Sequence, residues 1–221
     1  MKEHPTTFWL SLVSGFVDTA GFIALGGIFT AHVTGNFVLA GASLARAETQ
    51  GVASKLAMFP FFLLAVGLAS FVARRLEGRG PLFVLLLLEA VFLALFAAGN
   101  GLLGAPPHSE TRLALAGASG VIAMAIQNAY MRLHLASFAP TTVMTGNVTQ
   151  FAIDLFGLWW AAPSVERRAR LQKFGASLLG FFFGAIAGAV TVIRAGLPAA
   201  LLPAMIVLLI ALRARREGRP S

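Results

Sequence analysis

The chain has 221 residues, of which 57% are hydrophobic and only 12% charged, and its mean hydropathy is +0.81. Soluble domains have about 25% charged residues, so this composition excludes an ordinary soluble protein and predicts an integral membrane protein. The chain has no cysteine, which excludes a disulfide framework and a thiolate metal site. The histidines stand at no metal-ligand spacing, so we expect neither a metal nor another cofactor.

The net charge of +8 comes from short basic clusters at the ends of apolar runs. Such clusters are typical of the positive-inside rule, and no basic domain is present that could hold a nucleic acid. We therefore expect membrane lipids as partners and no nucleic acid. The first apolar run is too long for a cleavable signal peptide and contains Asp18.

In chain order, the apolar segments form two groups of four and predict an all-α, polytopic membrane helix bundle. We treat residues 1–221 as a single integral membrane domain with a basic cytoplasmic tail at 213–221 and one linker, "GAPPHSETR", at 104–112. The first group is expected at 8–29, 30–45, 56–73 and 81–103, and the second at 113–131, 141–160, 174–193 and 197–212.

A polar triplet occurs once in each group, as Thr34-Gly35-Asn36 and as Thr145-Gly146-Asn147, 111 residues apart. A polar residue precedes each triplet in the segment before it: Asp18 in the first group, and Gln127 and Asn128 in the second. This pattern predicts two internal repeats, at about 8–103 and 113–212.

The basic residues favour one topology over another. If the triplet segments are short or re-entrant, six helices cross, the repeats are inverted, and 13 basic residues lie inside against 4 outside. The alternative is eight membrane segments forming two parallel four-segment repeats, with 12 inside against 5 outside. The count favours six transmembrane helices with both termini cytoplasmic.

Polar residues at membrane depth predict a binding site, since broken segments at matching positions of two halves are typical of transporter sites. Inverted triplet segments would enter from opposite faces and meet near the midplane. The alternative is that Thr and Asn bond neighbouring helices and Gly permits close packing. The candidate substrate-binding residues are Asp18, Thr34, Gly35, Asn36, Gln127, Asn128, Thr145, Gly146 and Asn147.

Asp18 is the strongest single candidate, because a carboxylate deep in a membrane segment must be paired with another group, protonated or hydrated. It could bind a cation or relay a proton; alternatively, it forms a structural hydrogen bond to the amides of Gln127 and Asn128. His32, Glu89 and Asp154 are secondary candidates. With no nucleophile–base pattern, we expect the chain not to be an enzyme.

Gly180, Gly184 and Gly188 are spaced along one face of a segment and predict close helix packing. We favour an intramolecular contact, with a homo-oligomer as the alternative.

The stretches "SGFVDTAGFIALGGIFTAHVTGNFVLAGASLA" and "AMAIQNAYMRL" followed by "PTTVMTGNVTQFAIDL" resemble the two signatures of the YoaK-like bacterial membrane family, whose domain has no known function. The resemblance covers essentially the whole chain. It implies a multi-pass protein of the bacterial inner membrane with about six helices, and it implies no activity, substrate or cofactor. The site hypothesis is therefore a small-solute or proton-coupled transporter or channel; the alternative is a non-transporting scaffold, accessory or lipid-binding protein.

Overall fold

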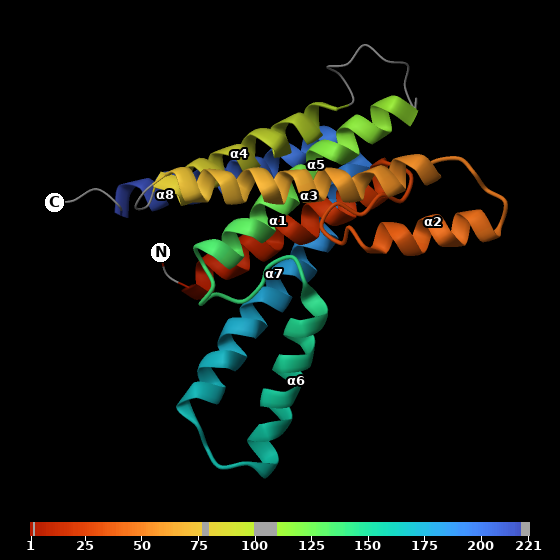
Figure 1. Cartoon of the computed structure of the whole chain (residues 1–221). Coiled ribbons are helices and arrows are strands. Elements are labelled where there is room, and N and C mark those ends of the chain that lie inside the picture. Colours follow the sequence, from red (N-terminus) through yellow and green to blue (C-terminus); the bar gives the residue numbers. More distant parts are fainter. Residues whose placement is uncertain (2, 77–79, 100–109, 218–221) are drawn as a thin grey trace.

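The structure is a computed structural model that describes residues 1, 3–76, 80–99 and 110–217. Within these ranges the regular structure is helical throughout (Figure 1). The helices are α1 (Glu3–Ala24), α2 (Gly35–Ala45), α3 (Val52–Arg75), α4 (Gly80–Ala98), α5 (Glu110–Leu133), α6 (Met144–Trp160), α7 (Val165–Ala195), the short 3-10 helix η1 (Leu197–Ala200) and α8 (Leu201–Glu217).

Six helical spans in the described part are long and apolar enough to cross a membrane. They are α1, α3, α4, residues Leu113–Leu133 of α5, α7, and the continuous stretch Leu197–Arg216 formed by η1 and α8. The helices that carry the triplets, α2 and α6, are shorter and are not among these spans. The structure thus confirms a helical bundle with six long apolar helices and two short triplet-bearing segments.

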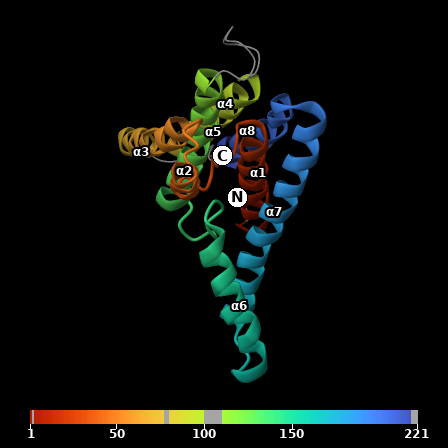
Figure 2. The same cartoon turned by 90° about the vertical axis from the view of Figure 1, so that its right-hand side faces the viewer.

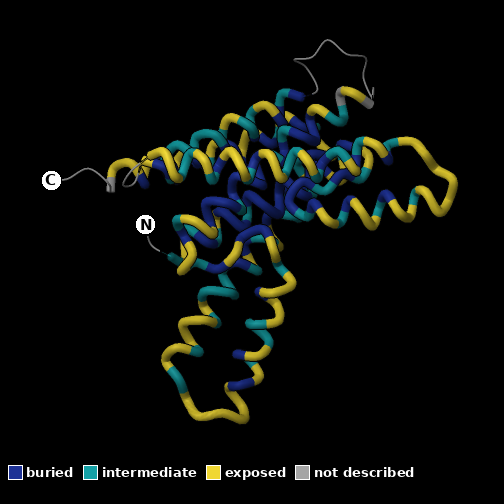
Figure 3. Tube along the Cα trace, viewed as in Figure 1, coloured by how far each residue is buried: buried dark blue, intermediate teal, exposed yellow. Residues whose placement is uncertain are grey.

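The long helices alternate in direction along the chain. Helices α1, α4 and α7 run toward one end of the bundle, and α3, α5 and α8 run toward the other, so that α1 begins and α8 ends on the same side (Figure 1). The hairpin of α6 and the first part of α7 extends away from the remaining helices (Figure 2). This hairpin is mostly exposed, whereas the middle of the bundle is buried (Figure 3).

The closest helix contact joins α1 to α7, which run parallel. A Cβ atom added at Gly180, Gly184 or Gly188 would come within 3.0 Å of a backbone carbonyl of α1, at Phe8, Leu12 and Phe16 respectively. Gly15 makes the reciprocal approach from α1 to the backbone of α7. The small residues let the two backbones touch, as in other membrane helix pairs. In this structure the glycine stripe lies in an intramolecular contact.

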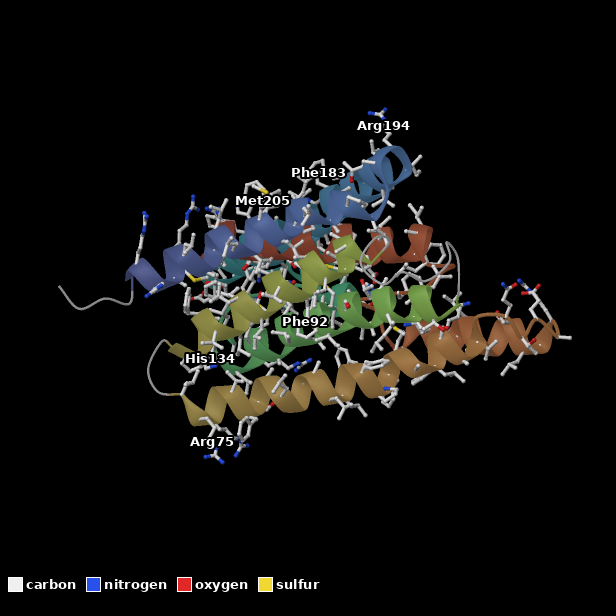
Figure 4. The ribbon with its side chains drawn as sticks, turned by 90° about the horizontal axis from the view of Figure 1, so that it is seen from above. Arg75, Phe92, His134, Phe183, Arg194 and Met205 are labelled. Carbon is white, nitrogen blue, oxygen red and sulfur yellow. The ribbon has the colours of Figure 1, made fainter. Side chains whose placement is uncertain are left out.

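The outer surface is apolar and the ends of the helices are basic. Phe183 of α7 and Met205 of α8 lie on the outside of the bundle, while Arg75 and Arg194 lie at opposite ends of it (Figure 4). This distribution suits a bundle whose sides face hydrocarbon and whose ends face water.

The predicted segment boundaries differ from the helices at two turns. Helix α1 ends at Ala24 rather than at 29, because Gly26 and Gly27 adopt positive φ angles of 65° and 81° that break the helix. Residues 25–34 therefore form a loop before α2. Helix α7 begins at Val165 rather than at 174, because Ser164 caps it by accepting a hydrogen bond from the Arg167 N–H.

The predicted linker falls mainly outside the described residues, at 104–109, and so do the predicted end of its preceding segment, at 100–103, and the last residues of the tail, at 218–221.

Candidate functional site

Asp18 holds the loop that follows its own helix. It is buried near the end of α1, and its Oδ1 accepts hydrogen bonds from the backbone N–H groups of Thr30, Ala31 and His32 at 2.8, 2.7 and 3.3 Å. The loop cannot satisfy these groups within a helix, because the chain has been turned back by the glycines before it. The carboxylate thus accepts the hydrogen bonds that helical carbonyl groups would otherwise accept from these N–H groups.

The second oxygen of Asp18 pairs with an imidazole. Oδ2 lies 2.6 Å from Nδ1 of His32, whose side chain is 39% exposed. The hydrogen bond to Asp18 raises the pKa of His32 above its usual value, and burial, which acts in the opposite direction, does not cancel this effect. The ring of His32 packs edge-on against Phe29 and against Phe181 of α7.

The asparagine of the first triplet clamps the same loop. Asn36 is fully buried; its Oδ1 accepts from the Phe29 N–H at 2.9 Å, and its Nδ2 donates to the Phe29 carbonyl at 2.8 Å. Gly35 leaves room for the Phe29 ring, since an added Cβ would lie 2.9 Å from Cδ2 of that ring. Thr34 is exposed and its side chain makes no capping bond to α2.

The second triplet has a similar but less complete clamp. Asn147 donates through Nδ2 to the Pro140 carbonyl at 2.7 Å, again seven residues earlier in the chain, and also contacts Oγ of Ser177 on α7 at 3.0 Å. Ser177 in turn bonds to Ser11 of α1 at 2.8 Å. Thr145 and Gly146 are exposed at the start of α6.

The two triplets do not meet. Helices α2 and α6 have no contact with each other in the described part of the chain. The side chains of Asn36 and Asn147 are instead each bonded to the loop just before their own helix. The structure therefore brings together Asp18, His32 and Asn36 around one loop, and places Asn147 beside Ser177 around the other.

Gln127 is linked to α1 rather than to Asp18. It is fully buried, and its Nε2 donates to the Leu10 carbonyl at 2.9 Å and to Oγ1 of Thr141 at 2.7 Å. The interpretation that Asp18 bonds to the amides of Gln127 and Asn128 does not match this arrangement, because the Asp18 oxygens are occupied by the loop at 30–32. Oε1 of Gln127 is buried without a partner.

A buried polar face on α1 was missed by the sequence analysis. Thr7, Ser11, Ser14 and Asp18 are all buried, and their spacing of four, three and four residues places them on one face of a helix. Oγ1 of Thr7 and Oγ of Ser14 have no hydrogen-bond partner. The signal was present in the sequence as a repeat of hydroxyl residues that ends at the acid.

Glu89 and Asp154, the remaining secondary candidates, are each bonded to a side chain of a neighbouring helix, and Asp154 also accepts from Gln150 Nε2 at 3.0 Å. Oε2 of Glu89, fully buried on α4, accepts from the Tyr130 hydroxyl of α5 at 2.7 Å, and its Oε1 has no partner. Asp154, buried on α6, forms two bonds with the guanidinium of Arg170 on α7, at 2.6 and 2.9 Å. Tyr130 is the only tyrosine of the sequence and was not singled out from it.

Two cavities lie beside the loops that follow α1 and α5. The first, which we name the Arg132 cavity, has a volume of about 250 Å³ and includes Asn128, Arg132, Thr141 and Thr142 in its lining. The second, of about 360 Å³, is lined by Gly26, Glu48 and Lys55 among others. Asn128, a predicted site residue, thus lines the first cavity together with Thr141, the partner of Gln127.

The fold and these contacts define a multi-pass α-helical membrane protein with buried polar residues inside its bundle. A family model described as "Protein of unknown function (DUF1275)" matches residues 6–213, and the chain belongs to that family. It is also similar to the UPF0700 transmembrane protein YoaK of Bacillus subtilis (strain 168), with 29% identity over 152 residues. That match covers 67% of this chain and 65% of the relative, so the chain spans just under two thirds of the relative's length.

These matches confirm the resemblance to a YoaK-like membrane family. No solved structure matches the chain.

Proposed function

We propose that the chain is a transporter or channel for a small solute or for protons, and that the polar face of α1 lines its route. The observation that carries this proposal is the set of buried oxygens without partners along and beside α1: Thr7 Oγ1, Ser14 Oγ, Thr30 Oγ1 and Gln127 Oε1. A buried polar atom without a partner costs about 1–3 kcal/mol, so two on one face of α1 and two on neighbouring segments favour a site that is filled by water or solute during function.

Two further features support the proposal. The face ends at Asp18, an acid inside a helix long enough to cross a membrane. In addition, α1 packs on α7 while α5 packs on α3, which is the exchange of partners expected if the two halves are inverted repeats. We include inverted repeats in the proposal.

The proposed setting is the bacterial inner membrane with both termini in the cytoplasm. The basic residues in the last turns of α3, α5 and α8 lie at the end where the chain begins, whereas Arg194 of α7 lies at the opposite end. Basic residues gather on the cytoplasmic side of membrane proteins, which supports this orientation.

Purified protein in liposomes tests the proposal. A pH-sensitive dye inside the liposomes follows protons, and a panel of labelled solutes is assayed in parallel. Replacing Thr7 and Ser14 together by Ala should slow flux about tenfold, because two lost hydrogen bonds of about 0.7 kcal/mol each raise the barrier by about 1.4 kcal/mol. Ser119→Ala is the matched control, because that hydroxyl bonds only to the Leu115 carbonyl of its own helix.

Asp18→Asn should abolish the flux in protein that still elutes as a folded species. Flux that is unchanged by the Thr7, Ser14 and Asp18 substitutions would count against the proposal.

A second candidate is a non-transporting, lipid-binding or scaffold protein. It is favoured by an apolar groove of about 810 Å³ between α1, α6 and α7, lined by residues that include Phe8, Phe151 and Leu179. It is also favoured by the bonds of Asn36, whose amide oxygen and nitrogen both bond to the backbone of Phe29 in the loop before α2. This candidate predicts tightly bound lipid in the purified protein and no flux of any assayed species.

A further inference from the structure

We propose that the Arg132 cavity binds a small oxyanion, with a carboxylate or phosphate group as the recognised chemistry. The cavity follows α5 and is formed by the end of that helix and by the loop that leads to α6. Its volume of about 250 Å³ corresponds to roughly eight water molecules at about 30 Å³ each, which suits an ion of the size of phosphate with part of its hydration shell.

The lining supplies the donors that an oxyanion requires. Arg132 offers a planar fork of N–H groups that matches two oxygens of a carboxylate or phosphate. Asn128 adds an amide, and Thr141 and Thr142 add hydroxyls. The Arg132 side chain makes no hydrogen bond or ion pair with another described residue, so within the described structure its charge is available to a ligand.

The charge around the cavity is positive. No acid lines it, in contrast to the cavity beside the α1 loop, which contains both Glu48 and Lys55. Lys173 of α7 donates to the carbonyl of Ser137 on the same loop and lies 3.5 Å from Glu3 of α1. Burial lowers the pKa of His134, so this neighbour is neutral at pH 7 and leaves Arg132 as the charge that lines the cavity.

Two side chains, Thr141 and Gln127, connect the cavity to the backbone of α1. Thr141 lines the cavity and accepts from Gln127, whose second bond reaches the Leu10 carbonyl next to Ser11. An anion in the cavity would therefore be separated from α1 by these two side chains. The proposal that this anion is the transported species rests on the proposed function. The proposal that the cavity binds the anion does not.

The same chemistry could be presented by a free anion or by the headgroup of an anionic lipid. The full-length protein is placed in nanodiscs of phosphatidylcholine, and saturable binding of radiolabelled inorganic phosphate is measured at constant ionic strength, with acetate and chloride as competitors. In a parallel arm, the thermal stability of the protein is compared between phosphatidylcholine nanodiscs and nanodiscs that contain phosphatidylglycerol.

We expect phosphate to bind, acetate to compete and chloride to compete weakly. Arg132→Gln should weaken binding at least about tenfold, because it removes a charge-assisted pair of hydrogen bonds, and Arg132→Lys should retain part of the affinity. Arg194→Gln is the matched control, since Arg194 is an exposed arginine at the end of α7. A helical circular dichroism spectrum and a single elution peak confirm that each variant is folded.

A lipid source would give no phosphate binding but a stabilisation by phosphatidylglycerol that is lost in Arg132→Gln, which still supports an oxyanion site. Phosphate binding that is the same in Arg132→Gln as in the native chain, or the absence of both effects, overturns the inference. The readout is binding rather than flux. A protein that binds phosphate but transports nothing would support the anion site and contradict the proposed function. A protein that transports a solute but shows neither binding effect would support the proposed function and contradict the anion site.

Discussion

Several buried polar side chains of this protein form their hydrogen bonds with backbone groups. Asp18 and Asn36 bond to main-chain groups of the loop at 29–32, and Asn147 bonds to the Pro140 carbonyl before α6. Backbone outside a helix can persist at membrane depth only when other groups of the protein satisfy it. These three side chains therefore keep non-helical backbone inside the bundle, whereas the hydroxyls of Thr7 and Ser14 on α1 have no hydrogen-bond partner.

Substitutions of Asn36 and Thr34, the two polar residues of the first triplet, should differ sharply in their effect on the free energy of unfolding. Asn36→Ala leaves the N–H and the carbonyl of Phe29 without partners and should lower the free energy of unfolding by about 2–6 kcal/mol, at about 1–3 kcal/mol for each of the two groups. Thr34→Ala should change it by less than about 0.5 kcal/mol, because that exposed side chain makes no capping bond. Denaturant unfolding in detergent micelles measures both, and equal losses would contradict a clamp by Asn36.

The pair of Asp18 and His32 should make stability depend on pH. The pKa of His32 is raised in the folded protein, so its stabilising contribution is fully present below the unfolded value of about 6.5 and is lost as the pH rises through the higher folded value. The thermal midpoint of the native chain should therefore fall over this window relative to His32→Gln. Since Asp18 and the rings of Phe29 and Phe181 are common to both proteins, parallel pH profiles would show that the pair contributes nothing.

At the scale of helices, the contact between α1 and α7 depends on the absence of side chains. Gly184→Ala places a Cβ within 3.0 Å of the Leu12 carbonyl, so the two backbones must separate. We expect a loss of about 1–3 kcal/mol from this overpacking. Gly67→Ala on α3 is the control; it meets nothing within 4 Å, and it should be neutral or stabilising by up to about 1 kcal/mol through helix propensity.

Thermal unfolding of both variants checks this prediction. A Gly184→Ala protein as stable as Gly67→Ala would mean that α1 and α7 do not touch at this point.

The helices themselves could be predicted from sequence much further than their contacts. Apolar runs interrupted by charges predict six long helices and two short polar ones, because length and hydropathy are local properties. The partners of Asp18 and Glu89 could not be predicted in this way. Asp18 bonds to a loop whose course depends on two left-handed glycines, and Glu89 meets Tyr130 only because α4 packs on α5.

The hydroxyl face of α1 could be predicted from the sequence in part. Serine and threonine are tolerated in membrane helices and attract little notice one at a time, yet Thr7, Ser11, Ser14 and Asp18 share one face. Their spacing is readable from the sequence. That two of the hydroxyls have no partner required the structure.

For the whole molecule, the direction of the helices predicts on which side each loop lies. Single cysteines at Thr49, between α2 and α3, and at Glu217, at the end of α8, lie at opposite ends of the bundle (Figure 1). In the proposed orientation a membrane-impermeant maleimide should label T49C in intact cells and E217C only after permeabilisation. The natural chain has no cysteine to interfere. Labelling of both positions from the same side would contradict six crossings.

The parallel contact of α1 with α7 also has a consequence for biosynthesis. Helix α1 is synthesised well before its partner α7, which begins only at Val165. At about 5–20 residues per second, roughly ten to thirty seconds pass before that partner is made. Throughout this interval a nascent helix with hydroxyls and an acid on one face waits in the membrane without the surface that buries it. Retention by the insertion machinery, or by a membrane chaperone, until α7 arrives would protect the unfinished chain from proteolysis.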